Sequence, residues 1–160
     1  MLLTSDVYLR DFNKVLEEKG YKKMEKASLN KSQVKSLMLE APPMIIYGMN
    51  EGTQILLKCW YGINDLTSVW YTNLTHIVEY VTENYIPSFI TAGNTDCYPE
   101  DALELKNQLE RLNVEFSYCY CDKSVEELKH GYMSSFETSI HAEMALNQCM
   151  EFIKEKVGLK

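Results

Sequence analysis

The sequence predicts an α/β protein with about three mostly parallel strands flanked by helices. Residues 88–92 and 114–121 are short apolar segments typical of strands, and an amphipathic helical segment lies between them. A strand, a helix and a strand in this order form a βαβ unit, whose right-handed crossover makes both strands parallel. A third strand is expected at residues 34–41, where Pro42 and Pro43 end it.

The first helix is expected over residues 5–19. Thr4, Ser5 or Asp6 can cap its start, and Gly20 is a typical residue to end it. Its buried side is expected to be formed by apolar residues at helical spacing, namely Val7, Phe12, Val15 and Leu16. The lysine-rich residues 21–31 that follow are expected to be a solvated connector.

The stretch from residue 88 to residue 112 places an acid at one edge of the sheet. Gly93 and Asn94 are turn residues that end the strand, so Asp96 is expected on the loop after it. Pro99 suits the first turn of the following helix. Ligands and catalytic groups gather at the carboxyl ends of strands in open α/β folds. The buried side of the helix is expected to comprise Leu103, Leu105, Leu109 and Leu112.

His130 follows the next strand, in the loop before a last helix expected over residues 139–156. Parallel neighbouring strands end at the same edge, so Asp96 and His130 should emerge together. A carboxylate can there hold an imidazole in one tautomer for general-base catalysis. Within the strand, Val114, Phe116, Tyr118 and Tyr120 alternate with Glu115, Ser117, Cys119 and Cys121.

The residues from Pro87 to Asp96, the helix after them and His130-Gly131-Tyr132 resemble the last third of an α/β-hydrolase. The resemblance is to microbial carboxylesterases and lipases of the hormone-sensitive-lipase type. In that family, the loop after the seventh strand carries the triad acid, which matches Asp96. The loop after the eighth strand carries the triad histidine before a glycine and an aromatic residue, which matches His130. The resemblance therefore implies that Asp96 and His130 are catalytic.

The resemblance also implies a domain organisation. Residues 1–160 would form a single domain, the C-terminal part of an α/β-hydrolase, with residues 34–41 as its sixth strand. Residues 42–75 are rich in Met, Tyr and Trp, and the resemblance implies a cap-like insertion over an apolar acyl pocket. A small satellite core beneath a loop is an equal alternative for this segment.

The serine nucleophile of the family has no counterpart here. The sequence lacks Gly-x-Ser-x-Gly, the strained turn that presents this serine, and lacks a His-Gly-Gly-Gly run for the oxyanion hole. Residues 48–52 have the spacing of the motif but place Asn50 at the nucleophile position. An Asn side chain has no hydroxyl or thiol to form an acyl-enzyme, so we interpret this match as a coincidence of turn residues.

Other nucleophiles are disfavoured. Cys97 adjoins Asp96, and a neighbouring carboxylate raises the pKa of a thiol. Ser134 and Ser135 follow His130 too closely in sequence to be presented by a separate turn. Asp96 has a simpler alternative role, which is to cap the helix that begins near Pro99.

Two functions follow from these residues. The first is the C-terminal portion of a serine carboxylic ester hydrolase, an esterase or lipase that carries the acid and base and is inactive alone. It would act on a small acyl ester only when the missing half completes it. The alternative is a degenerate, non-catalytic hydrolase-fold protein that binds a ligand or partner through Trp60, Tyr61, Trp70 and Tyr71. A flavodoxin-like module that binds phosphate or metal at residues 93–96 is disfavoured, because no Gly-rich phosphate loop is present.

Composition and charge exclude some classes of binding partner. The formal net charge is −7 at pH 7 and the pI is near 5.0, which argues against nucleic-acid or anionic-membrane binding. No apolar run approaches the roughly 20 residues of a membrane span, and the first residues lack the features of a signal peptide. The strand expected at residues 34–41 would have an unpaired edge, which predicts self-association of the chain through that edge.

Cysteine and histidine usage predicts neither metal nor cofactor. Five cysteines at irregular spacing fit reduced thiols in the cytoplasm. Cys119 and Cys121 share a strand face, where partly buried thiols are favoured over a metal site. His76 lies among apolar residues and His141 at the start of the last helix, so neither is expected to be functional.

Overall fold

The computed structural model describes residues 6–27, 32–44, 51–61, 65 and 67–159, without the side chains of residues 53, 57, 60, 61 and 70. The chain divides into two compact units. One comprises Met1–Asn30 and Met44–Tyr80, and the other comprises Lys31–Pro43 and Val81–Lys160. The single domain with an insertion at residues 42–75 stays a prediction.

The first unit is helical. Its elements are α1 (Asp6–Glu18), α2 (Glu51–Tyr61), α3 (Val69–Thr75) and the 3₁₀ helix η3 (Ile77–Tyr80). Tyr8 of α1 stacks on Phe12 and meets Tyr80 edge to face, with ring centroids 5.8 Å and 4.9 Å apart. Val15 is buried as expected, but the expectation that Val7 is buried is wrong, because α1 turns Leu9 inward and leaves Val7 exposed. None of the helices among the described residues has the length and apolar character to cross a bilayer.

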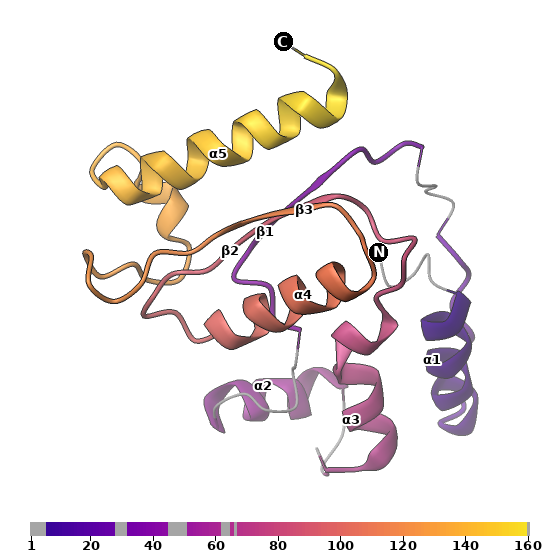
Figure 1. Cartoon of the computed structure of the whole chain (residues 1–160). Coiled ribbons are helices and arrows are strands. Elements are labelled where there is room, and N and C mark those ends of the chain that lie inside the picture. The colour runs from indigo at the N-terminus through magenta and orange to yellow at the C-terminus, as the bar shows by residue number, and fades with distance from the viewer. Residues whose placement is uncertain (1–5, 28–31, 45–50, 62–64, 66, 160) are drawn as a thin grey trace. The chain divides into compact units, whose positions relative to one another are not determined.

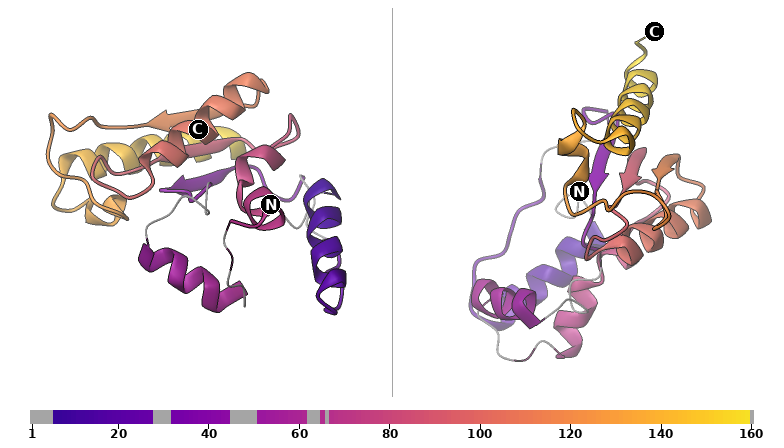
Figure 2. Two further views of the ribbon diagram at one scale, coloured as in Figure 1. Left: turned by 90° about the horizontal axis from the view of Figure 1, so that it is seen from below. Right: turned by 90° about the vertical axis from the view of Figure 1, so that its left-hand side faces the viewer.

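The second unit contains a parallel sheet of β1 (Leu37–Glu40), β2 (Ser88–Thr91) and β3 (Phe116–Cys119), in the order β1-β2-β3 (Figure 2). The predicted α/β class with three parallel strands is confirmed. Each strand has four residues, so all three are shorter than the apolar patterns indicated. Every residue of β2 is buried, as expected of a central strand covered on both faces.

Helices α4 (Pro99–Arg111) and α5 (Ile140–Val157) cover opposite faces of this sheet (Figure 1). Pro99 occupies the first turn of α4, as predicted. At the start of α5, the Ser139 side chain accepts a hydrogen bond from the Ala142 N–H at 3.1 Å, and Gly158 ends the helix in the left-handed conformation. The core beneath α5 contains Phe89, Cys119, Cys121, Leu128, Tyr132, Met133, Ala142, Ala145, Cys149 and Phe152.

One expectation about the buried face of α4 is wrong. Leu103 is 46% exposed, because α4 packs through Ala102, Leu105 and Leu109. For α4 the periodicity is right and the choice of covered face is not. Cys119 of β3 and Cys121 after it face the core, as expected of partly buried thiols. Tyr120 lies beyond the end of β3 at Cys119 and is exposed, and its ring stacks on that of Tyr118 at 6.3 Å between centroids.

Tyr132 closes a buried hydrogen-bond chain above β2 and β3. The Thr91 hydroxyl donates to the Cys119 carbonyl at 2.7 Å, so the Tyr132 phenol must donate to Thr91 Oγ1, 2.6 Å away. Burial raises the pKa of Tyr132 above its usual 10.0. The folded protein therefore keeps a proton that the unfolded chain releases above about pH 10, and this contribution to stability is lost as the pH rises further.

Tyr132→Phe is expected to lower the free energy of unfolding by about 1 kcal/mol at pH 8. Between pH 10 and 11 the difference from the wild type should shrink, because the variant lacks the shifted phenol. Urea unfolding of both proteins at pH 8, 10 and 11 measures this. A difference that stays constant with pH would contradict the assignment.

Candidate active site

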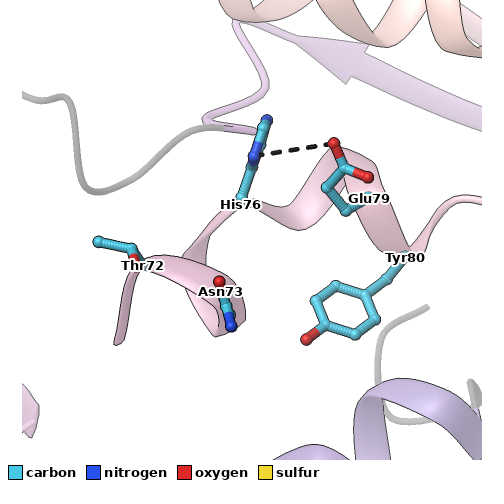
Figure 3. A pocket seen from close by; sticks show the side chains of 5 residues that line it. All are labelled: Thr72, Asn73, His76, Glu79 and Tyr80. Atoms are coloured by element: carbon cyan, nitrogen blue, oxygen red, sulfur yellow. Dashed lines mark ion pairs between the residues drawn. The ribbon is translucent and has the colours of Figure 1, made fainter. Parts of the chain in front are cut away.

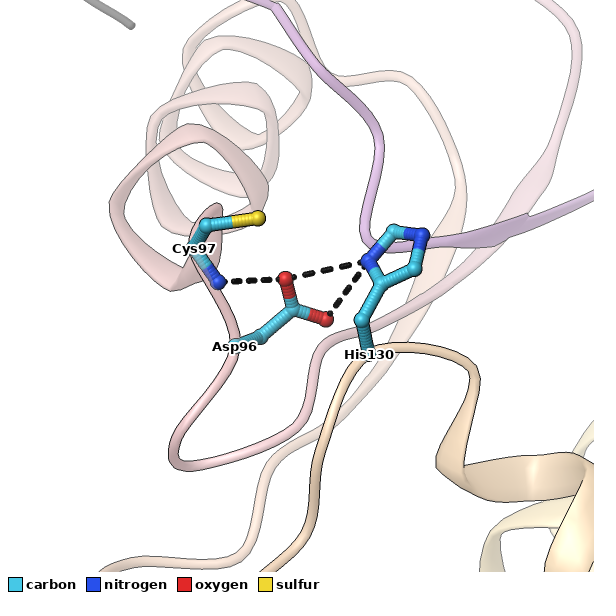
Figure 4. Close-up of side chains that lie close together, drawn as sticks. All are labelled: Asp96, Cys97 and His130. Carbon is cyan, nitrogen blue, oxygen red and sulfur yellow. Dashed lines mark hydrogen bonds and ion pairs between the residues drawn. The ribbon is translucent and has the colours of Figure 1, made fainter. Parts of the chain in front are cut away.

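Asp96 and His130 lie on the two loops that leave the carboxyl ends of β2 and β3. The structure brings them together. His130 Nδ1 lies 3.1 Å from each oxygen of the Asp96 carboxylate (Figure 4). The Asp96 side chain has no exposed surface, whereas the His130 side chain is 62% exposed. The pair is thus a buried acid bonded to an imidazole that faces solvent.

Hydrogen bonds hold the two loops against each other. Asn94 is 2% exposed, and its Oδ1 accepts from the Leu128 N–H at 2.9 Å. The Asn94 amide nitrogen donates to the carbonyls of Asp122 and Glu126 at 2.9 and 3.0 Å. The backbone N–H and the hydroxyl of Thr95 both donate to the Leu128 carbonyl, at 3.1 and 3.0 Å. These contacts determine how far the His130 loop lies from the Asp96 loop.

Gly93 allows this close approach. A Cβ at Gly93 would lie 2.2 Å from the Leu128 carbonyl oxygen and 2.6 Å from that of Lys129. The sequence indicated only that Gly93 is a turn residue. The structure shows that the space beside it is occupied by the backbone that leads into His130.

The Asp96 carboxylate is also bound by backbone donors. Its Oδ1 accepts from the N–H of Cys97 at 2.6 Å and from that of Tyr98 at 3.2 Å. Both donors lie just before α4. Asp96 therefore accepts hydrogen bonds from backbone N–H groups near the helix start, which is part of the capping role given above as its simpler alternative. The residue that caps α4 is Tyr98, which makes no side-chain capping bond. Asp96 thus combines a local role with its bond to His130.

His130 is oriented for acid–base chemistry. An acceptor carboxylate at Nδ1 favours the tautomer with a proton there, which leaves Nε2 as the basic atom. Nε2 points away from the carboxylate (Figure 4), and it accepts no hydrogen bond from a described residue. The Tyr98 ring lies edge-on to the imidazole, with 5.9 Å between centroids. Tyr98 was not predicted, and no pattern in the sequence points to this contact.

A hydrogen bond connects the residues that follow His130 to the end of β1. Gly131 has a φ of +73°, and the 3₁₀ helix η4 (Tyr132–Ser135) follows it. The Met133 N–H donates to Glu40 Oε1 at 2.8 Å, and Glu40 is the last residue of β1. All three described strands therefore contribute to holding His130, although only two were predicted to do so.

Cys97 is an exposed thiol beside the pair. Ligand atoms of Asp96, Cys97 and His130 all lie within 4.8 Å of one another. Partial burial raises the pKa of the Cys97 thiol, and the Asp96 carboxylate raises it further. Cys97 is therefore a weak nucleophile at neutral pH, as expected from the sequence.

The structure describes only some of the other proposed nucleophiles and aromatic residues. Ser134 Oγ donates to the Gly131 carbonyl at 2.8 Å, within the turn that begins η4. Asn50 and the side chains of Trp60, Tyr61 and Trp70 lie outside the described residues. Tyr71 is buried, so its ring does not offer the ligand surface that the binding hypothesis needs.

The remaining histidines each meet a glutamate. His76 Nδ1 lies 3.9 Å from Glu79 Oε1, beside a pocket of 440 Å³ that Thr72, Asn73 and Tyr80 also line (Figure 3). His141 Nδ1 lies 2.8 Å from Glu126 Oε1. Hydrogen bonds from Ser139 and His141 lower the pKa of Glu126.

Comparison with known proteins shows which solved structure the fold resembles. Neither a protein-family model nor a curated protein matches this chain. Among solved structures it is similar to the carboxylesterase Cest-2923 from Lactobacillus plantarum WCFS1, with a TM-score of 0.56 and 12% sequence identity. The chain has a partial α/β-hydrolase fold, with three parallel strands among the described residues. The match covers 99% of this chain and 55% of the carboxylesterase, so the chain spans about half the length of that hydrolase.

Proposed function

We propose that this chain supplies the acid–base half of a serine carboxylesterase of the hormone-sensitive-lipase type. The observation that carries the proposal is the Asp96–His130 pair, in which a fully covered carboxylate is bonded to Nδ1 of an exposed imidazole. The hydrolase fold and the order of strand, acid, helix, strand and histidine support it. The His130-Gly131-Tyr132 sequence supports the narrower assignment.

In this proposal His130 works on a serine supplied by the missing half. Nε2 takes the serine proton as the hydroxyl oxygen attacks the ester carbonyl, and then gives that proton to the leaving alcohol. A water molecule, deprotonated in the same way, hydrolyses the acyl-enzyme and frees the acid. Asp96 orients the imidazole and stabilises its charged form throughout. The substrate class is a small acyl ester.

The test is reconstitution with the polypeptide encoded directly upstream in the genome. The proposal expects that reading frame to encode a strand, Gly-x-Ser-x-Gly and a helix. The 160-residue chain and its His130→Ala variant should hydrolyse p-nitrophenyl acetate at equal background rates. Co-expression with the upstream polypeptide should produce activity, which His130→Ala should lower by at least about 10⁴-fold.

His141→Ala is the matched control, because this histidine also contacts a carboxylate but lies outside the pair. It should leave the reconstituted rate unchanged. Two outcomes would overturn the proposal. One is an upstream region without the motif, and the other is a reconstituted enzyme that keeps its rate when His130 is replaced.

A non-catalytic binding protein is the second candidate, favoured by the absence of Gly-x-Ser-x-Gly from the sequence. The upstream reading frame distinguishes the two, since a binding protein needs no serine-bearing partner.

We also propose a cytoplasmic location, supported by five cysteines that are all free thiols. Self-association would use the edge of β1, where Met38 is exposed.

A further inference from the structure

We infer that Asp96, Cys97 and His130 form a binding site for a zinc-like divalent metal ion. A carboxylate oxygen, a thiol sulfur and an imidazole nitrogen lie within 4.8 Å of one another, and the oxygen–nitrogen distance is 3.1 Å. Zinc with ligands at its usual bond lengths of about 2.0 to 2.3 Å separates tetrahedral ligand atoms by roughly 3.4 to 3.6 Å. Small side-chain rotations therefore suffice to close the three atoms around an ion.

The donor set selects the class of metal. Sulfur and imidazole nitrogen are ligands of zinc and of neighbouring transition metals, whereas Mg²⁺ and Ca²⁺ prefer oxygen alone. Three protein ligands leave the fourth tetrahedral position for a water molecule or a small anion. With Asp96 and Cys97 as anions, the two negative charges balance the charge of the ion.

The surroundings of Asp96 suit a metal ligand. The Cys97 and Tyr98 N–H groups both donate to Oδ1, so the carboxylate is oriented before an ion arrives. Oδ2 accepts only from His130 among the described residues, so it keeps a lone pair for an ion. Cys97 and His130 are exposed, which gives an ion access from solvent.

Proton balance is simple for such a site. The ion takes the place of the proton on His130 Nδ1, and the imidazole remains neutral by carrying its proton on Nε2 instead. The Cys97 thiol binds as the thiolate and releases one proton to the buffer. The metal and the acid–base pair compete for Nδ1, so a metal-bound chain cannot use His130 as a base. The metal site itself does not rest on the proposed esterase function.

Cobalt titration of the metal-free 160-residue protein tests the inference. Co²⁺ should bind in a 1:1 ratio, with a thiolate charge-transfer band in the near ultraviolet and the intense visible bands of four-coordinate cobalt, and Zn²⁺ should displace it. Cys97→Ser should abolish the charge-transfer band and weaken Zn²⁺ binding by more than about tenfold. His130→Ala should weaken binding similarly.

Cys59→Ser and His141→Ala are the matched controls, because each removes an equivalent side chain elsewhere. Both should bind like the wild type. Bands that persist in Cys97→Ser would overturn the inference, as would bands lost in Cys121→Ser, which would move the ion to the Cys119–Cys121 face. Circular dichroism of each variant checks its fold. Ester hydrolysis is measured with a chelator present, so either proposal can fail without the other.

Discussion

Gly93→Ala is expected to lower the free energy of unfolding by about 3 kcal/mol, the upper end of the range for overpacking. The new Cβ would lie 2.2 Å from the Leu128 carbonyl oxygen and 2.6 Å from that of Lys129. Both atoms belong to the backbone, which cannot rotate away as a flexible side chain can. The two loops must therefore separate, and the Asp96–His130 hydrogen bond should lengthen or break.

Urea unfolding measures the loss of stability, and nitrogen-detected NMR of the His130 ring reports whether Nδ1 keeps its hydrogen bond. Gly131→Ala is the matched control, because it adds the same methyl group beside His130 with nothing within 4 Å. Its φ of +73° costs about 1 to 2 kcal/mol in backbone strain alone. Equal losses for the two variants would show that contact with Leu128 does not constrain the site.

Asn94→Ala is expected to destabilise the protein by a similar amount, about 3 kcal/mol. The change removes three hydrogen bonds, each with a net worth of roughly 1 kcal/mol, and leaves the Leu128 N–H buried without an acceptor. The carbonyls of Asp122 and Glu126 belong to exposed residues, so water can partly replace the lost amide there. The loop that carries His130 should become more mobile.

Asn94→Asp separates lost hydrogen bonds from a lost side chain, because it has the same shape. Its carboxylate still accepts from the Leu128 N–H but repels the Asp122 and Glu126 carbonyls, so it should destabilise as well. Asn84→Ala is the control, since Asn84 is exposed and, among the described residues, its side chain donates a hydrogen bond to the adjacent Glu83 alone. Urea midpoints and amide hydrogen exchange of residues 122–130 measure the effects. An Asn94→Ala variant within about 0.5 kcal/mol of wild type would contradict this role.

The sequence was informative where structure depends on neighbours along the chain. A short apolar run predicted β2, apolar alternation predicted β3, and Pro99 and Ser139 predicted the starts of α4 and α5. The right-handed crossover makes the strands parallel, so the sequence alone predicts Asp96 and His130 at one sheet edge. The hydrogen bond between them agrees with that placement, while their catalytic role stays a prediction.

Contacts between distant segments were not predictable. Periodicity shows which residues share a face but not which face another element covers, so Val7 and Leu103 were assigned to the wrong side. Gly93 and Asn94 had the pattern of turn residues, yet both meet the backbone near Leu128. The position of Glu40 beneath Met133 had no signal at all.

The sequence by itself therefore determined the order of the elements, the parallel sheet and the edge at which an acid and a histidine emerge. Only the tertiary structure decided how closely the two loops pack, which carboxylate oxygens face His130, and that Cys97 joins them. The reason is physical. Local propensity acts over a few residues, whereas the separation of two loops depends on backbone contacts between residues some thirty positions apart.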